Sequence, residues 1–257
     1  MKRDVQSVLL VLIGGAVLRI SAFSEVYLRY VKEGLRPFLI AAGACLLLLG
    51  LIGAVLDGVL RRQADTSAVR QLATDHVPEG ELPTGGDHDH GHDHQRGPRV
   101  AWLLCLPVFA IFLIAPDPLG AFAASRDRGT VAPPGDSGFS ALPAGNPLRL
   151  TLSEFAVRAV WDKSESLKGR TVLLTGFVTP HATTEAWYLT RIVLSCCAAD
   201  GTPIKIEVRG AESLPADTWV EVTGTWIPTG QEPSESVIPV ISAQTVRKIS
   251  PPKQTYE

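Results

Sequence analysis

The sequence predicts a membrane protein with two parts, namely three transmembrane helices followed by a C-terminal all-β domain, an OB-like five-stranded barrel. Two observations lead to this fold class. The first half contains long uncharged apolar runs, whereas the second half contains short segments in which apolar and polar residues alternate. An uneven distribution of this kind indicates two regions that face different solvents.

Three apolar runs, near residues 5–23, 38–56 and 100–115, predict a membrane region over residues 1–124. A spanning helix needs about 20 mostly apolar residues, and the second run satisfies this outright. The first run spans the membrane if the charge of Arg19 reaches the interface, and the third if Pro116 bends or ends it. Apolar residues 119–124 extend the third run. A cleaved signal peptide is the alternative for the first run.

Small residues on the second run predict a face for close helix packing, because Gly50, Ala54 and Gly58 recur every four residues. No charged residue lies at the middle of any run, whereas ion pathways normally contain intramembrane polar groups. The chain alone is therefore not expected to form a pore. The distribution of Lys and Arg modestly favours a cytoplasmic N-terminus, which places the C-terminal domain outside the cytoplasm after three crossings.

A histidine-rich loop, residues 61–99, separates the second and third runs. Four of the protein's six histidines alternate with Asp and Gly in it: His88, His90, His92 and His94. Imidazoles beside carboxylates suit a divalent metal such as zinc. The flanking Gly and Pro residues predict adaptable binding without the fixed spacing of a catalytic zinc site. A solvated low-complexity loop is the alternative.

Residues 125–150 are rich in Gly and Pro and are predicted to be a linker before a β domain at 151–257. A helix is expected at 151–160, where Thr151 and Glu154 have the spacing of a capping box. Alternating or β-branched patterns then predict five strands. They lie at residues 170–179, 187–195, 203–209, 218–227 and 237–249. Five short strands in this order suggest an OB-like barrel.

Nucleic acid is not an expected partner, although OB barrels often bind it. The net charge is −2, and the C-terminal domain contains no basic run. Nucleophile elbows, phosphate-binding loops, dinucleotide fingerprints and zinc-protease motifs are also absent from the sequence. We therefore predict no catalytic residues and no cofactor-binding motif, and no enzyme activity.

Cys196 and Cys197 are adjacent at the end of the second predicted strand. Successive residues of a regular strand point to opposite faces, so the two thiols can share a site only if the backbone bends there. The turn-like residues 198–203 permit such a bend. Four interpretations stay open: a metal or metalloid thiolate site, a redox pair, an intermolecular contact, and inert packing. His181, Arg191 and Asp200 are the nearest polar candidates in sequence.

At these residues the chain resembles a bacterial group, the YcgQ-like permease-subunit family. The resemblance covers most of the chain, and the Arg…Cys-Cys-Ala-Ala-Asp run at 191–200 is its most specific part. Further matching stretches are Leu28-Arg29-Tyr30-Val31, Leu167-Lys168-Gly169-Arg170, Thr175-Gly176-Phe177-Val178 and Trp219-Val220-Glu221-Val222-Thr223-Gly224, together with the His-rich loop. The resemblance implies a membrane protein that works with a separate multi-span permease of the YcgR-like kind.

From these observations we expect an integral membrane accessory subunit of a permease, for a metal or another thiophilic solute. An independent membrane-tethered thiol-redox or metal-delivery protein is the alternative. A purely structural or interaction domain, in which the cysteines only pack, is a third hypothesis.

Overall fold

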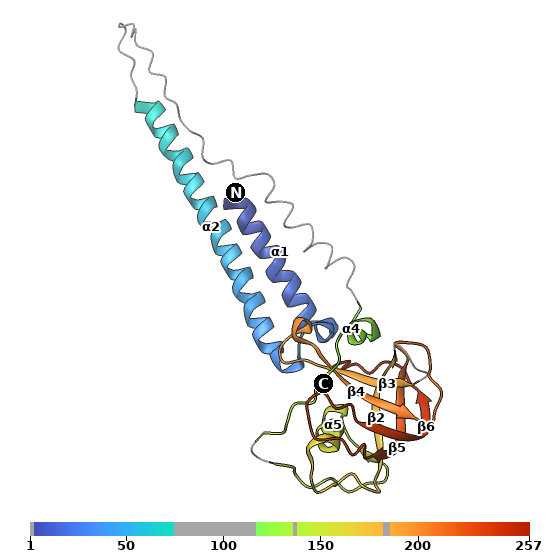
Figure 1. Ribbon diagram of the computed structural model, residues 1–257. Helices are drawn as coiled ribbons and strands as arrows, with labels where there is room; N and C mark the ends of the chain where they lie inside the picture. Colours follow the sequence, from blue (N-terminus) through green and yellow to red (C-terminus); the bar gives the residue numbers. More distant parts are fainter. Residues whose placement is uncertain (1–2, 75–116, 136–137, 182–185) are drawn as a thin grey trace, which may run out of the picture. The chain divides into compact units, whose positions relative to one another are not determined.

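The computed structural model describes residues 3–74, 117–135, 138–181 and 186–257 (Figure 1). The chain forms two compact units. The first contains the helices α1 (Arg3–Ala22) and α2 (Arg36–Thr74), and the second comprises Glu25–Leu35 and Asp117–Glu257. The predicted third run at 100–115 and the four loop histidines His88, His90, His92 and His94 lie outside the described residues.

The helical unit is an apolar hairpin in which α1 and α2 pack side by side (Figure 1). Among the described residues, one helix, Glu33–Leu60, is long and apolar enough to cross a membrane, whereas the apolar part of α1, Gln6–Ala22, is shorter. Large apolar side chains of α2 remain exposed, and Val55 is 63% accessible. Because little of this apolar helix is covered by protein, membrane association explains its composition better than a soluble core does.

Glycines allow the two helices to approach closely, but their spacing differs from the prediction. A Cβ added at Gly50 would lie 2.9 Å from the Ser7 carbonyl oxygen, so Gly50 is in the interface as expected. Among the described residues Ala54 is exposed and a Cβ at Gly58 would meet nothing within 4 Å, so neither residue contacts α1. Gly43 and Gly53 of α2 also approach α1 closely, and a Cβ at Gly53 would lie 2.7 Å from the Ser7 Oγ. Gly43 and Gly50 are seven residues apart, and this spacing suits side-by-side packing because two helical turns return a residue to the same face.

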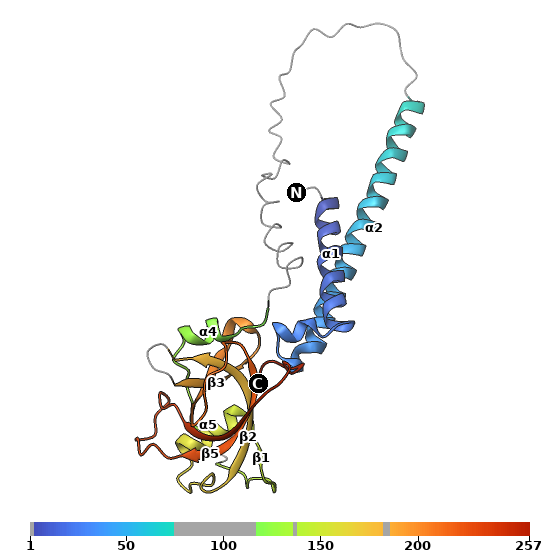
Figure 2. The same cartoon turned by 90° about the vertical axis from the view of Figure 1, so that its right-hand side faces the viewer.

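The second unit is a closed five-stranded barrel, which confirms the barrel part of the prediction and fits an OB-like fold (Figure 2). Strands pair in the order β2-β3-β4-β6-β5 and then back to β2. All pairs are antiparallel except β4 with β6. The strands are β2 (Thr171–Pro180), β3 (Trp187–Val193), β4 (Thr202–Arg209), β5 (Trp219–Ile227) and β6 (Val240–Lys248). A two-residue strand, β1 (Leu148–Arg149), adds to β2 in parallel.

The helix α5 (Leu152–Trp161) packs against the barrel and contributes to its core (Figure 2). It begins as predicted, because the Thr151 hydroxyl accepts a hydrogen bond from the Glu154 backbone N–H at 3.0 Å. Leu152 and Phe155 are fully buried. The core around them consists mostly of inward-facing residues of the alternating strands, including Leu174, Leu189, Ile206, Val222 and Ile241.

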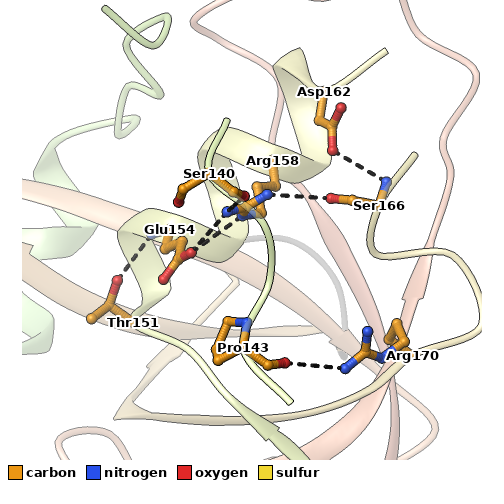
Figure 3. Close-up of polar contacts among 8 residues, drawn as sticks. All are labelled: Ser140, Pro143, Thr151, Glu154, Arg158, Asp162, Ser166 and Arg170. Atoms are coloured by element: carbon orange, nitrogen blue, oxygen red, sulfur yellow. Dashed lines mark hydrogen bonds and ion pairs between the residues drawn. The ribbon is translucent and has the colours of Figure 1, made fainter. Parts of the chain in front are cut away.

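Residues 125–150, predicted as a linker, contact the barrel unit at several points. Arg158 of α5 is buried and donates to the carbonyl of Ser140 at 2.8 Å, as well as to Glu154 (Figure 3). Trp161 Nε1 donates to the Val131 carbonyl at 2.9 Å. These residues therefore belong to the folded unit, and the arginine fork explains how a Gly/Pro-rich segment is held without regular structure.

Residues 119–124 also belong to this unit. The short helix α4 (Ala121–Arg126) buries Ala121 and Ala124 in a cluster with Phe177 and Tyr256. The apolar character of this stretch therefore reflects packing on the barrel and not, as the sequence suggested, an extension of the third apolar run.

Candidate thiol and metal site

The strand β3 ends at Val193, two residues earlier than predicted, and the chain then bends at Ser195 and Cys196. A short 3-10 helix, η4 (Ala198–Asp200), follows. The bend places the Cys196 and Cys197 Sγ atoms 3.6 Å apart. The backbone therefore turns at the pair, and the alternation that would separate the two thiols does not apply.

Asp200 holds this bend in place. Its Oδ1 accepts a hydrogen bond from the Ser195 N–H at 3.0 Å, and its Oδ2 accepts one from the Cys196 N–H at 2.8 Å. A third N–H, that of Cys197, lies 3.4 Å from Oδ2. One carboxylate thus satisfies the donors that the ended strand leaves without ladder partners, which is why a residue with a short acidic side chain is needed at this position.

The same carboxylate controls the protonation of the site. A hydrogen bond with Asp200, followed by one with Cys197, raises the pKa of the Cys196 thiol from 9.0 to about 11. The hydrogen bond from Cys196 lowers the pKa of Asp200 in turn. At neutral pH Cys196 is therefore a protonated thiol beside an ionised carboxylate. A bound cation would replace the thiol protons and reverse this preference, because metals coordinate the thiolate form.

The geometry suits a metal ion that binds both sulfurs with a bent S–metal–S angle. One ligand atom each of Cys196, Cys197 and Asp200 lie within 4.8 Å of one another. With metal–sulfur bonds of about 2.3 Å, the observed sulfur separation corresponds to an S–metal–S angle of about 100°. A linear two-thiolate ion would need sulfurs about 4.6 Å apart at the same bond length. The pair therefore matches tetrahedral Zn²⁺ or Cd²⁺, with a coordination position left for a further ligand.

The other polar candidates do not join this cluster. The His181 ring packs against Tyr188, with ring centroids 5.3 Å apart. Arg191 is buried beneath the C-terminal segment, where it donates to the carbonyls of Gln254 and Tyr256 at 3.1 and 3.2 Å. Arg191 thus fixes the end of the chain against β3, and of the three nearest polar candidates only Asp200 is a potential ligand.

The segment Glu25–Leu35 joins α1 to α2, and we call it the connector. It packs directly on residues 195–200, which we call the thiol loop. Val31 forms an antiparallel bridge with Cys197. The Lys32 N–H donates to the Cys196 carbonyl at 3.1 Å, and the Ala198 N–H donates to the Tyr30 carbonyl at 2.7 Å. Sequence reasoning did not predict this contact. The only signal was that Leu28–Val31 and the cysteine run occur together in the resemblance.

A separate cleft of about 860 Å³ lies between the connector, α4 and the barrel. Its lining combines aromatic residues with both signs of charge, including Phe122, Phe177, Trp219, Arg29 and Lys253. Neither cysteine lines it, so the thiol site and this cleft are distinct.

The family comparison adds one finding. Residues 148–257 match the family model of the DUF1980 C-terminal domain. This match fits a permease-associated family, whereas the YcgQ-like resemblance and its permease partner stay predictions. No curated protein and no solved structure matches the chain.

Proposed function

We propose that this protein is a membrane-anchored accessory subunit of the YcgQ-like kind, and that it works with a separate multi-span permease. We further propose that its barrel binds a divalent metal such as zinc at Cys196 and Cys197. The observation that carries the proposal is the 3.6 Å separation of the two Sγ atoms beside the Asp200 carboxylate. Two thiols and a carboxylate form a ligand set for a thiophilic or borderline metal ion, and not for Mg²⁺ or Ca²⁺.

Metal coordination is favoured over redox cycling by the positions of the two cysteines. Adjacent Cα atoms are about 3.8 Å apart across a trans peptide, whereas disulfides usually join Cα atoms about 4.4–6.8 Å apart. A disulfide within this pair would therefore be strained. In addition, the raised pKa of Cys196 keeps this thiol out of the nucleophilic thiolate form. Chelation of a metal ion needs no sulfur–sulfur bond, and the bound cation itself displaces the thiol proton.

The structure also supports a multi-pass topology for the proposal. The connector belongs to the same compact unit as the barrel, so the two lie on one side of any membrane that α1 and α2 cross. The apolar run at 100–115 would return the chain to that side before the barrel begins. The distribution of Lys and Arg modestly favours a position of this side outside the cytoplasm. The loop with His88, His90, His92 and His94 would then be cytoplasmic, where it could bind the same metal adaptably.

A partner is part of the proposal because the described membrane helices contain no feature of a pore. The hairpin interface is closed by glycine contacts, and Gly14 would place a Cβ within 2.6 Å of the Leu47 backbone nitrogen. Transport would then depend on a separate permease, to which this subunit would present or from which it would receive the metal.

A metal titration of the full chain in detergent, under reducing conditions, tests the site. To remove the histidine loop from the measurement, His88, His90, His92 and His94 are first changed to Ala. Cd²⁺ is then followed by its thiolate charge-transfer absorbance. We expect one equivalent to bind, and expect the double variant Cys196→Ser/Cys197→Ser to lose it. Cys45→Ser removes a different free cysteine and is the matched control. Equal binding by the double variant and this control would refute the metal site.

A second experiment tests topology and partnership. A periplasmic-type reporter fused after Glu257 should be active if the barrel is extracytoplasmic, and a cytoplasmic reporter at the same place should be silent. Affinity purification from native membranes should recover a multi-span permease in a fixed ratio to this chain. Full activity of the protein in membranes that lack every such permease would rule out the subunit hypothesis.

A further inference from the structure

We infer that the connector between α1 and α2 locks the thiol loop in its metal-chelating conformation, and that metal bound at Cys196 and Cys197 holds the connector in place in return. This inference rests on the proposed metal site and specifies how the site would act on the segment that joins α1 to α2. It requires that metal binding and connector docking depend on the same atoms, and the structure contains such a group.

The shared group is the peptide unit between the two cysteines. Its carbonyl, that of Cys196, accepts a hydrogen bond from the Lys32 N–H at 3.1 Å. Its N–H, that of Cys197, points to Asp200 Oδ2 at 3.4 Å. The orientation of this one planar unit also sets the directions of both side chains. Rotation of the unit would therefore break the contact with the connector and separate the two sulfurs at the same time.

The connector forms backbone contacts with this peptide unit and with the residue that follows it. Val31 bridges Cys197, and the Ala198 N–H donates to the Tyr30 carbonyl at 2.7 Å, one residue beyond the unit. The connector has anchors of its own elsewhere. Tyr27 is only 3% exposed, and the Tyr256 hydroxyl donates to the Arg29 carbonyl at 2.9 Å. Loss of the single bond from Lys32 should therefore loosen the thiol loop without detaching the connector.

Thermodynamic linkage makes the effect reciprocal. If docking of the connector raises metal affinity by some factor, bound metal stabilises the docked connector by the same factor. The connector is continuous in sequence with α1 and α2, so metal occupancy on the barrel would stabilise the eleven residues, Glu25–Leu35, that join these two helices.

Substitution of Lys32 by proline tests the lock in the background that lacks the four loop histidines. Proline removes the N–H donor, and Val31 is already in an extended bridge, the conformation that a residue before proline prefers. Lys32→Ala is the matched control, because it also removes the ammonium group but keeps the N–H. We expect Lys32→Pro to bind Cd²⁺ about 2- to 10-fold more weakly than Lys32→Ala, the ratio expected from one hydrogen bond.

Hydrogen exchange on the unaltered connector provides a second measurement that needs no proline. Added Cd²⁺ should slow exchange of the Lys32 and Ala198 amides, and the double variant Cys196→Ser/Cys197→Ser should show no such slowing. If Cd²⁺ binds but the two Lys32 variants have equal affinity and connector exchange does not change, the lock is refuted and the metal site stands. If no Cd²⁺ binds to Cys196 and Cys197 at all, both the proposed function and the lock are refuted.

Discussion

Replacing Asp200 by Asn should convert Cys196 from an unreactive thiol into a reactive one. Asn has nearly the same shape but carries no charge, and one end of its amide donates where the carboxylate accepts. The substitution removes the largest cause of the raised Cys196 pKa, which is the hydrogen bond with Asp200. It also replaces one of the two oxygens that accept from the N–H groups of Ser195 and Cys196 by an amide nitrogen that cannot accept.

The size of the effect follows from the pKa values. At pH 8 a thiol with a pKa of about 11 is about 0.1% thiolate, whereas one at 9.0 is about 9% thiolate. Full reversal would therefore raise the thiolate fraction about 90-fold. Cys197 also contributes to the shift, so we expect alkylation of Cys196 at pH 8 to become about 10- to 90-fold faster.

The assay is iodoacetamide labelling over pH 7–11, followed by peptide mass spectrometry. A Cys197→Ser background ensures that the label in this peptide reports on Cys196 alone. Glu212→Gln, which neutralises an exposed carboxylate on another loop, is the control. The midpoint of the pH profile should move to lower pH in Asp200→Asn and stay in place in the control. An unchanged midpoint would show that Asp200 does not set the protonation of the thiol.

Three further predictions concern stability. Gly14→Ala should destabilise the helical hairpin by about 1–3 kcal/mol, because its Cβ would lie 2.6 Å from a backbone nitrogen of α2. Gly15→Ala is the control, since its Cβ would meet no described atom within 4 Å. Equal thermal unfolding of the two variants in detergent would contradict this prediction. Burial raises the pKa of Asp162, but hydrogen bonds from two serines outweigh it and lower the pKa to about 2. The stabilisation from Asp162 is therefore complete above about pH 4 and is lost as the pH falls towards 2. Asp162→Asn should remove this part of the acid dependence of unfolding. If the variant and the wild type show the same acid dependence, the Asp162 turn does not contribute to stability. Arg191→Met should lower the free energy of unfolding by about 1–3 kcal/mol, since two carbonyls of the C-terminal segment lose their donor. Urea unfolding and tryptic release of that segment measure the loss, and wild-type resistance would refute it.

The barrel could be predicted from sequence because its strands are short runs rich in β-branched residues, and because β4 alternates apolar with charged residues. Ile204, Ile206 and Val208 face inward on β4, and each is buried. The strand boundaries were harder to predict. β3 ends before the cysteines because Asp200 accepts the N–H groups that would otherwise continue the ladder, and a side-chain acceptor four or five residues ahead has no periodic signature.

The thiol site was predictable only in part. The sequence identified Cys196 and Cys197 and the condition under which they could share a site, namely a bend between them. It could not choose Asp200 over His181 and Arg191, because proximity in sequence does not decide proximity in space. The connector was not predicted at all, since backbone hydrogen bonds such as Lys32 N–H to the Cys196 carbonyl require no particular side chain.

The hairpin shows a similar limit. A four-residue spacing of small residues was visible around Gly50, and Gly50 does contact α1. However, the contact with α1 also includes Gly43, which lies seven residues before Gly50. The small residues of α2 are compatible with either spacing. Only the partner helix, with Ser7 and Gly14 at the contact, selects between them.

The attachment of the connector to the barrel also has a consequence for biosynthesis. Tyr256 binds the Arg29 carbonyl, and the ribosome makes these residues 227 positions apart. The connector therefore emerges early, and the Arg29 carbonyl can accept its hydrogen bond from Tyr256 only after the residues up to Tyr256 have been made. Contacts of such long range form late in folding. Assembly of this surface therefore requires that the chain has been made as far as Tyr256, and a chain that stops earlier would leave the Arg29 carbonyl without this donor.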